Sequence, residues 1–477
     1  MNRLRASLPL LFVFVTAIAL VVFKIPQLAL PAYWDEGFPY VYGIRYLADH
    51  HLTMLPDGMP PLYSTGHPTL FYFLSAAWMR LFGTGIAAAH VFPLLISVVL
   101  LFAVYRFGKT FVAPWAGAIA AFLLATRTIF ITQSGFLLPE MLVALFTILA
   151  FQAWLQKKKG GYILWASLLL LTKEPGLVLI AVLGLVDLTG AFRDKEQSWK
   201  KKIAGLMLTA APVIPAVIFF IIQRIQMGWF FFPRHINSFH TTTGVFFNKL
   251  YQCFGAHFFI YYGGIFTSVI TLAAFAFIYT KHKKLPSLQR KFIFTTLLLV
   301  AAWIIFFSFS FPIPRYMLCL YGPWFVAVAL LLISIFSETK KWIGYAILAI
   351  AGIVQLGYAY DIRSRGDFDL GYIDVVKTQR DAIRWAVENG FRDKKVFTQQ
   401  QMQRAMMSDA AGFVKASETF ADVSNTIDPH TALFIFTCTE TDRSDTIARK
   451  LPLKQAARFE SGKAWTEIYV SELPAAK

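Results

Sequence analysis

Residues 7–29, SLPLLFVFVTAIALVVFKIPQLA, form an apolar run that leads into the stretch Tyr33-Trp34-Asp35-Glu36-Gly37. About 20 apolar residues are needed to cross a bilayer as a helix, and this run is long enough. Its basic start is like that of a signal peptide, but no clear small-x-small cleavage site follows, so we interpret it as an uncleaved span. Adjacent carboxylates then lie at the membrane surface, where charged groups are costly and usually have a role.

The composition of the whole chain agrees with a polytopic membrane protein. Of the 477 residues, 57% are hydrophobic and only 15% are charged. The net charge of +18 would suit nucleic acid, but most of the excess Lys and Arg lies in short loops between apolar runs, as the positive-inside rule requires. We therefore expect the lipid bilayer, and no nucleic acid, as a partner. The three cysteines form neither a paired framework nor a metal-binding spacing.

The sequence predicts about eleven membrane spans. The candidate runs lie near residues 7–29, 86–105, 114–132, 137–156, 161–172, 175–192, 203–225, 256–280, 292–311, 316–336 and 342–360. The run 67–82 is short, contains Arg80 and begins with His-Pro, which suits a helix lying in the interface. The short runs 161–172 and 175–192 could also form a broken pair that turns at the outer surface.

The distribution of Lys and Arg predicts on which side of the membrane each loop between the spans lies. If residues 67–82 do not cross, all the basic loops fall on one side: Arg3/Arg5, Arg106/Lys109, Lys157–Lys159, Arg193–Lys202, Lys281–Lys291 and Lys340/Lys341. If they did cross, the cluster Lys157–Lys159 would face outward, against the rule. The N-terminus is therefore expected inside and the C-terminus outside. The outer face would hold surface helices at about 38–51 and 67–82, within the loop 31–85, and a larger loop at 226–255.

The composition becomes polar after Tyr360, and the predicted fold class changes with it. Residues 1–360 are expected to form an all-α polytopic membrane domain, and residues 361–477 a small extracytoplasmic α/β domain. Asp374–Glu388 has a helical pattern that ends at Asn389-Gly390. The segments Lys395–Gln399, Ala432–Thr437 and Trp465–Val470 have the pattern of short strands.

Several carboxylates gather at the outer ends of the predicted spans. Asp35 and Glu36 suit a base or a metal site, or they cap the helix that follows. Glu140 follows Pro139 at the start of a span, where it could tune the pKa of Asp35 or only favour the helix N-terminus. A divalent metal held by Asp35 and Glu140 stays open at this point.

Cations accompany these carboxylates at the same face. Lys173 and Glu174 lie at the tip of two short apolar runs, where the lysine could bind a lipid phosphate or snorkel to the interface. Arg315 and Tyr316 begin a later span, and an arginine suits bidentate phosphate binding, although both residues also suit an interfacial anchor. His67 opens the second surface helix, where a histidine is more often structural than catalytic.

These residues, in this order, resemble the GT-C glycosyltransferases. The resemblance rests on Asp35-Glu36 after the first span, His67-Pro68, Glu140, the stretch Leu171-Thr172-Lys173-Glu174-Pro175 and Pro314-Arg315-Tyr316. It covers roughly residues 1–360 and is nearest to the protein O-mannosyltransferases and the bacterial aminoarabinose transferases that modify lipid A. Glu140 stands where the latter often have Asp, and His67 is followed by Pro-Thr in place of the commoner Pro-Pro.

The resemblance implies an inverting sugar transfer from a polyprenyl-phosphate donor to an acceptor hydroxyl of a protein, lipid or glycan. It implies Asp35 and Glu140 as catalytic residues, and Glu36, His67, Lys173, Glu174, Arg315 and Tyr316 as substrate-binding residues. The expected location is the inner membrane of a bacterium, with the site on the periplasmic side. Two other interpretations of the sequence are a lipid or sugar-lipid transporter and a membrane assembly partner, in which the charges would serve transport or anchoring.

Overall fold

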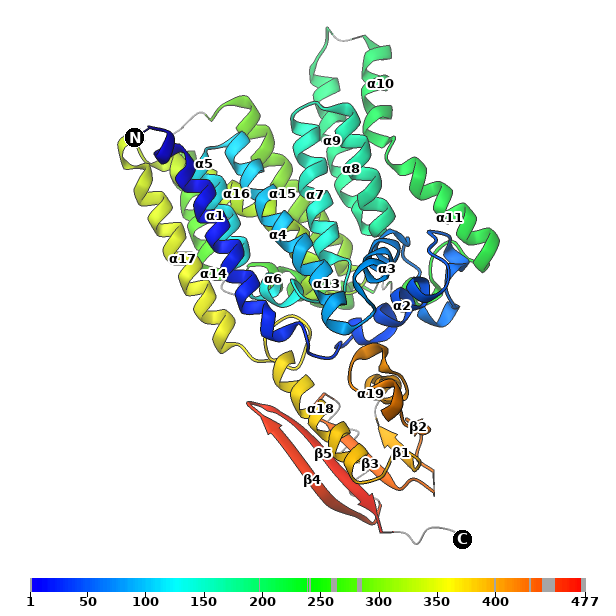
Figure 1. The fold of residues 1–477 in the computed structure, drawn as a ribbon. Coiled ribbons are helices and arrows are strands. Elements are labelled where there is room, and N and C mark those ends of the chain that lie inside the picture. Colours follow the sequence, from blue (N-terminus) through cyan, green and yellow to red (C-terminus); the bar gives the residue numbers. More distant parts are fainter. Residues whose placement is uncertain are drawn as a thin grey trace.

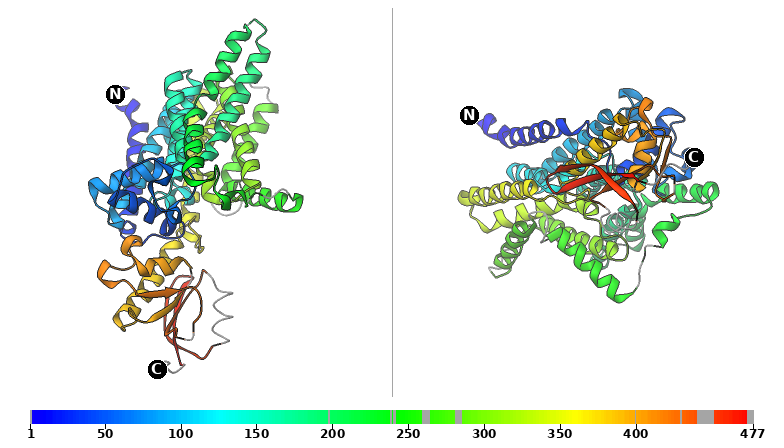
Figure 2. Two further views of the ribbon diagram at one scale, coloured as in Figure 1. Left: turned by 90° about the vertical axis from the view of Figure 1, so that its right-hand side faces the viewer. Right: turned by 90° about the horizontal axis from the view of Figure 1, so that it is seen from below.

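In the computed structural model, a helical bundle precedes a small C-terminal sheet (Figure 1). The structure describes residues 2–472 apart from 197, 238, 240–241, 259–263, 281–284, 399, 429 and 440–450. The predicted basic residues Lys281, Lys283 and Lys284 lie outside the described residues. In its turned view, Figure 2 shows the C-terminal part projecting from one end of the bundle. The predicted fold class, a helical membrane protein with a small C-terminal α/β part, is confirmed.

Helices occupy every predicted apolar run. In chain order they are α1 Asn2–Lys24, α4 Ile86–Phe111, α5 Pro114–Ala125, α6 Thr128–Gln133, α7 Glu140–Leu155, α8 Lys159–Thr172, α9 Leu177–Arg193, α10 Trp199–Ala210, α11 Val213–Met227, α14 Gly264–Thr280, α15 Ser287–Ser308, α16 Leu318–Ile335 and α17 Lys341–Asp361. The run 203–225 is divided between α10 and α11, which meet at an angle of 51°. The run 114–132 is divided between α5 and α6.

The predicted count of eleven spans is not confirmed. Among the described residues, six helices are long and apolar enough to cross a membrane, or seven with the bent pair α10–α11. Helices α5, α7 and α8 have 12, 16 and 14 residues. At 1.5 Å per residue each rises less than the ~30 Å of a hydrocarbon core. The six long helices nevertheless make the chain an integral membrane protein.

The surface helices of the first loop are short. They are α2 Val41–Asp49 and α3 Leu70–Phe82, which pack against each other, and the turn Glu36–Tyr40 leads into α2. The predicted loop 226–255 is wrong in part, because it contains α12 Pro233–Ile236 and most of α13 Thr243–Phe258. Helix α13 packs against α14 and α15, and its Cys253 is fully buried.

Basic loops and surface helices lie at opposite ends of the bundle. The loops α4–α5, α7–α8, α9–α10 and α16–α17 gather at the end where the N-terminus lies (Figure 1). Helices α2 and α3 lie at the other end, together with the C-terminal part. The bundle therefore separates two differently charged faces, as the distribution of Lys and Arg predicts.

The C-terminal part is a five-stranded sheet with helices against it. Its strands are β1 Lys395–Thr398, β2 Asp422–Ser424, β3 Leu433–Thr437, β4 Leu453–Ser461 and β5 Ala464–Ser471, in the order β2-β1-β3-β5-β4. Strands β2, β1 and β3 run parallel to one another, whereas β5 is antiparallel to both β3 and β4. Helix α18, Tyr372–Glu388, packs on the sheet through Ala382, Ile383 and Ala386. A second helix, α19, spans Gln400–Met407.

The loop between α1 and α4 is held by the C-terminal part. The backbone N–H of Ala32 donates to the carbonyl of Ala411 over 2.8 Å, and the hydroxyl of Tyr42 donates to the carbonyl of Arg404 over 2.7 Å. Arg45 forms an ion pair with Asp409 at 3.0 Å. These contacts flank Asp35 on both sides in the sequence, so the position of that carboxylate depends on residues beyond 400.

Two glycines let α4 and α5 approach closely. A Cβ added to Gly117 would lie 2.3 Å from the carbonyl oxygen of Tyr105, and one added to Gly108 would lie 2.4 Å from the Cα of Gly117. Small residues at such contacts allow backbones to meet, which is how helices pack in membranes. The α4–α5 contact therefore has no room for a side chain at either position.

We expect Gly117→Ala to lower the midpoint of thermal unfolding in detergent, because overpacking costs about 1–3 kcal/mol. Gly184→Ala in α9 is the matched control, since a Cβ there meets nothing within 4 Å. Its midpoint should be unchanged or higher, since alanine favours a helix by up to ~1 kcal/mol over glycine. Equal midpoints for Gly117→Ala and the unmodified protein would contradict the close contact.

Candidate active site

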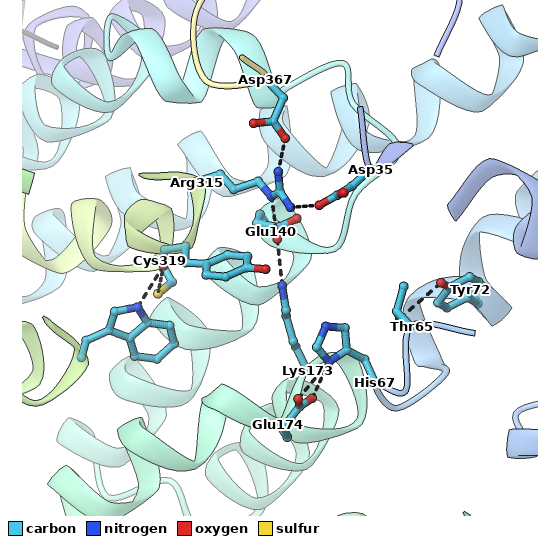
Figure 3. Close-up of polar contacts among 12 residues, drawn as sticks. Asp35, Thr65, His67, Tyr72, Glu140, Lys173, Glu174, Arg315, Cys319 and Asp367 are labelled. Carbon is cyan, nitrogen blue, oxygen red and sulfur yellow. Dashed lines mark hydrogen bonds and ion pairs between the residues drawn. The ribbon is translucent and has the colours of Figure 1, made fainter. Parts of the chain in front are cut away.

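Arg315 lies at the centre of a cluster of carboxylates (Figure 3). It belongs to the turn Pro314–Met317 that begins α16. Its Nη2 contacts Asp35 in the first outer loop, its Nη1 contacts Asp367 in the segment after α17, and its Nε lies 3.4 Å from the Oε1 of Glu140 at the start of α7. One guanidinium thus joins three segments that are far apart in the sequence.

Lys173 reaches the same carboxylate from the α8–α9 turn. Its Nζ donates to the Oε1 of Glu140 over 2.9 Å. The ammonium also lies 4.0 Å from the ring centroid of Tyr316, a cation–π distance. The backbone of Lys173 is extended at the end of α8, and the turn Glu174–Gly176 follows, so the side chain is directed across the turn toward α7.

Burial distinguishes Asp35 from the other members of the cluster. Arg315, Glu140, Lys173 and Asp367 are all buried, whereas the side chain of Asp35 is 43% exposed. Water and a dissolved or lipid-borne hydroxyl can therefore reach Asp35 while its partner Arg315 stays desolvated. This suits a group that exchanges protons beside a fixed positive charge.

The two cations keep hydrogen-bond donors to spare. A guanidinium has five N–H donors and an ammonium three. Within the described residues, Arg315 makes the three side-chain contacts above and Lys173 makes one. Two N–H groups of each cation then stay available to an anion that enters the site. A phosphate oxygen is a suitable acceptor, since charge-assisted hydrogen bonds of this kind are the strong ones.

The cations border a small cavity with apolar walls. Glu140, Lys173, Arg315 and Tyr316 line it together with Val143, Pro175, Trp303, Phe307 and Cys319. The indole N–H of Trp303 donates to the carbonyl of Tyr316 over 2.9 Å, which fixes one wall. The Oε2 of Glu140 is buried without a hydrogen-bond partner among the residues that the structure describes. The cavity's volume of about 10 Å³ is room for a single water, so a phosphate attached to an apolar chain would enter only as these side chains move apart.

The charges of the cluster do not balance. Three carboxylates, Asp35, Glu140 and Asp367, face two cations, which leaves one negative charge in excess. Burial raises the pKa of the Asp367 carboxyl to about 6, against the opposing attraction of Arg315. Asp367 is therefore the member that takes up a proton as the pH falls below neutral.

Glu36 does not face this cluster, although it is adjacent to Asp35. It is buried, and its carboxylate accepts from the backbone N–H groups of Leu137 and Tyr33 over 2.6 and 3.3 Å. Its Oε1 lies 2.8 Å from the Nε2 of His90, whose Nδ1 is 2.9 Å from the carbonyl of Leu28. Glu36 thus ties the first loop to the segment before α7 and to α4.

His67 and Glu174 pair with each other beside the cluster. The Nδ1 of His67 lies 2.9 and 2.8 Å from the two carboxylate oxygens of Glu174 (Figure 3). The contact joins the segment before α3 to the α8–α9 turn that carries Lys173. Both side chains are partly exposed, so they form part of the surface around the site.

Asp367 is the member of the cluster that the sequence analysis missed. It lies in the polar segment between α17 and α18, where an acidic residue has nothing to mark it. The predicted site residues already hold four carboxylates against the cations Lys173 and Arg315, so their charge gives no sign of a further acid.

The two carboxylates expected as ligands of a divalent metal both contact cations. Among the described residues, no group of three or more His, Cys, Asp or Glu side chains is placed to hold a metal ion. Asp35 and Glu140, the proposed ligands, both face Arg315. The carboxylates are therefore arranged around a guanidinium.

We expect Asp367→Asn to change how stability depends on pH. An aspartate ionises near pH 4 in an unfolded chain, whereas the folded state keeps the Asp367 proton up to about pH 6. The stabilisation present at low pH is therefore lost as the pH rises from 4 through 6. The measurement is the midpoint of thermal unfolding as a function of pH. Between pH 4 and 6 the midpoint of the unmodified protein should fall relative to that of Asp367→Asn, and above pH 7 the difference between the two midpoints should be constant.

The exposed Asp57 gives the control for this titration. The difference between the unmodified protein and Asp57→Asn should show no such fall between pH 4 and 6. A pH-independent difference for Asp367→Asn as well would contradict the raised pKa.

Comparison with known proteins gives a fold but no sequence relative. No family model and no curated protein matches the sequence. The structure of ArnT from Cupriavidus metallidurans bound to undecaprenyl phosphate matches with a TM-score of 0.58 and 14% identity, covering 98% of this chain and 99% of that one. The apo structure of the same protein matches with a TM-score of 0.59, 12% identity and the same coverage.

A more distant match is the oligosaccharyltransferase of Archaeoglobus fulgidus, with a TM-score of 0.47 and 13% identity over 88% of this chain and 63% of that one. That likeness is too weak to carry an argument. The two matches to ArnT extend over nearly the whole chain, including the C-terminal sheet. The expected resemblance is confirmed at the level of fold: the chain has the fold of ArnT over nearly its whole length.

Proposed function

We propose that the chain is an inverting glycosyltransferase that moves a sugar from a polyprenyl-phosphate donor to an acceptor hydroxyl. The observation that carries this proposal is the meeting of Lys173 and Arg315 on Glu140, at the wall of a cavity that is otherwise aromatic and apolar. The cations suit a phosphate, and the apolar wall suits the chain to which it is attached. The match to ArnT bound to undecaprenyl phosphate supports this kind of ligand.

The reaction is a single displacement at the anomeric carbon. The acceptor oxygen forms the new bond while the bond from the sugar to the phosphate oxygen breaks, and the phosphate leaves with the electron pair. Asp35 takes the proton of the acceptor hydroxyl, a contribution of roughly 10²–10⁴-fold. Lys173 and Arg315 stabilise the charge that grows on the phosphate, and one such contact contributes ~3 kcal/mol by analogy with oxyanion donors.

Glu140, Tyr316 and Asp367 arrange the cations for this task. Glu140 binds both Lys173 and Arg315 through one oxygen, so it sets the distance between them. Asp367 fixes the opposite edge of the guanidinium. We assign Glu36 a positioning role for the Asp35 loop, because its carboxylate is committed to Leu137, Tyr33 and His90.

His67 and Glu174 are proposed to contact the sugar or the acceptor. Their pair lies beside Lys173 and is partly exposed. The sugar and the acceptor, whether protein, lipid or glycan, would enter from this side, where α2 and α3 form the outer surface.

The proposed location is the inner membrane of a bacterium, with the site at the periplasmic surface. The Lys-rich loops lie at the other end of the bundle, which the positive-inside rule places in the cytoplasm. Residues 361–477 would then form an extracytoplasmic domain, with Asp367 in the segment that enters it.

We expect Asp35→Asn to lower sugar transfer by at least a hundredfold, because an amide cannot accept the hydroxyl proton. The measurement is label transfer from a radiolabelled polyprenyl-phosphate sugar in membranes that contain the protein. Arg315 keeps Glu140 and Asp367 in this variant, so the fold should persist. Asp57→Asn, an exposed change in the same loop, should transfer normally. Full transfer by Asp35→Asn would refute its role as the base.

We expect Lys173→Met to raise the donor KM and to lower kcat, because the ammonium contacts the phosphate in the ground state and more strongly as it leaves. The combined loss in kcat/KM should be roughly 10²–10³-fold. Steady-state kinetics with varied donor concentration separate the two effects. Lys340→Met, at the far end of the bundle, should change neither constant.

A second variant separates chemistry from stability at Lys173. Lys173→Met leaves Glu140 with one cation, whereas Lys173→Met combined with Glu140→Gln removes both charges of the pair. The double variant should recover thermal stability without recovering kcat/KM. Recovery of kcat/KM would show that Lys173 serves only to neutralise Glu140.

A further inference from the structure

A second basic cavity lies at the end of the bundle remote from the candidate active site. It has a volume of about 540 Å³, within the ordinary size of a ligand pocket. It is formed by the ends of α7 and α9, the beginnings of α8, α10 and α15, and the α7–α8 loop. Six lysines line it: Lys157, Lys158, Lys159, Lys201, Lys202 and Lys291.

Asp187 organises one wall of this cavity. Its Oδ2 accepts from the indole N–H of Trp154 over 2.9 Å and from the hydroxyl of Thr209 over 2.7 Å. Its Oδ1 lies 3.7 Å from the Nζ of Lys291, which also sits 3.9 Å from the ring centroid of Trp154. These contacts tie α7, α9, α10 and α15 together, so the cavity is part of the packed bundle.

The cavity carries a surplus of positive charge. Asp187 is the single carboxylate among its lining residues, against six lysines, which leaves five positive charges in excess. Positive charges that line one hollow raise the local potential and favour the binding of an anion. The positive-inside rule explains lysines in loops, but Arg106, Lys109, Lys340 and Lys341 obey that rule without lining this cavity. The convergence of six lysines on one hollow therefore needs a further reason.

The lining of the cavity changes character along α10. On α10, Lys201 and Lys202 lie near the helix start, and Leu206 and Leu208 line the cavity further along. Lys201 and Leu208 are seven residues apart, about 10 Å along the helix axis. On the same helix Ile203 and Met207 are exposed, as expected of side chains that face lipid. A ligand with an anionic head and an apolar chain matches this order.

We propose that this cavity binds the phosphate head group of an anionic phospholipid from the leaflet opposite the candidate active site. The lysines bind the phosphate, and Leu206 and Leu208 contact the first part of an acyl chain. Basic pockets between transmembrane helices on the cytoplasmic side suit such head groups. Lipid binding at this cavity does not depend on sugar transfer, so its test is independent of the function proposed above.

The test measures lipid binding to the purified full chain by native mass spectrometry. The unmodified protein should bind phosphatidylglycerol in preference to phosphatidylcholine, whose head group has no net charge. The variant Lys157→Gln/Lys201→Gln/Lys202→Gln should bind phosphatidylglycerol roughly a hundredfold more weakly, because each lysine near an anionic head group contributes about a fivefold factor. Equal binding by this variant and the unmodified protein would overturn the proposal.

A matched variant controls for the overall charge of this face. Lys109→Gln/Lys340→Gln/Lys341→Gln removes three lysines from the same end of the bundle outside the cavity, and it should bind phosphatidylglycerol as the unmodified protein does. An equal loss in both triple variants would assign the binding to diffuse charge and would also overturn the proposal. Thermal unfolding midpoints show whether each variant is folded. The single variant Lys201→Glu should also bind phosphatidylglycerol more weakly than the unmodified protein does.

Inorganic phosphate distinguishes a lipid from a soluble anion. In competition, phosphate at tenfold excess over phosphatidylglycerol should leave the lipid bound, because it lacks the chain that contacts Leu206 and Leu208. Displacement of the lipid at that excess would show that the cavity takes a soluble anion, and the lipid assignment would be wrong.

Discussion

The pairing of the Arg315 guanidinium with three carboxylates is the interaction on which the candidate site depends. A buried charge without partners is strongly destabilising, and Asp35, Glu140 and Asp367 supply the partners that let this arginine stay desolvated. Each carboxylate comes from a different part of the chain, and their shared partner brings those parts to one point. The same arginine is proposed to bind the donor phosphate, so assembly of the site and binding of the substrate use one side chain.

Much of this cluster can be predicted from the sequence, because charges stand out against apolar runs. Asp35, Glu140, Lys173 and Arg315 each lie at the end of such a run, and the alternation of basic loops predicts that those ends share one face. Asp367 lies among other polar residues, where one more carboxylate carries no signal. Asp35 and Glu36 show a second limit: they are neighbours in the sequence, but their side chains go to different partners, which only the packing of the loop decides.

In the fold too, the sequence pattern predicts some elements, whereas others depend on packing. The predicted strands near β1, β3 and β5 are confirmed, because their apolar residues are buried in the sheet. Strand β4 is mostly exposed and β2 has three residues, so neither has a pattern to recognise. The span count stays unconfirmed for a related reason: an apolar run indicates hydrophobicity, whereas the breaks at α5–α6 and α10–α11 depend on local backbone geometry.

The attachment of the first outer loop to the C-terminal part has an evolutionary consequence. Ala32, Tyr42 and Arg45 contact residues between 404 and 411, on either side of a loop position that must meet Arg315. A chimaera that takes its helical bundle from one homologue and its C-terminal part from another would join surfaces that were selected separately. Substitutions in residues 32–45 and 404–411 should therefore covary across relatives, and recombination between the two regions should be tolerated only when both are inherited together.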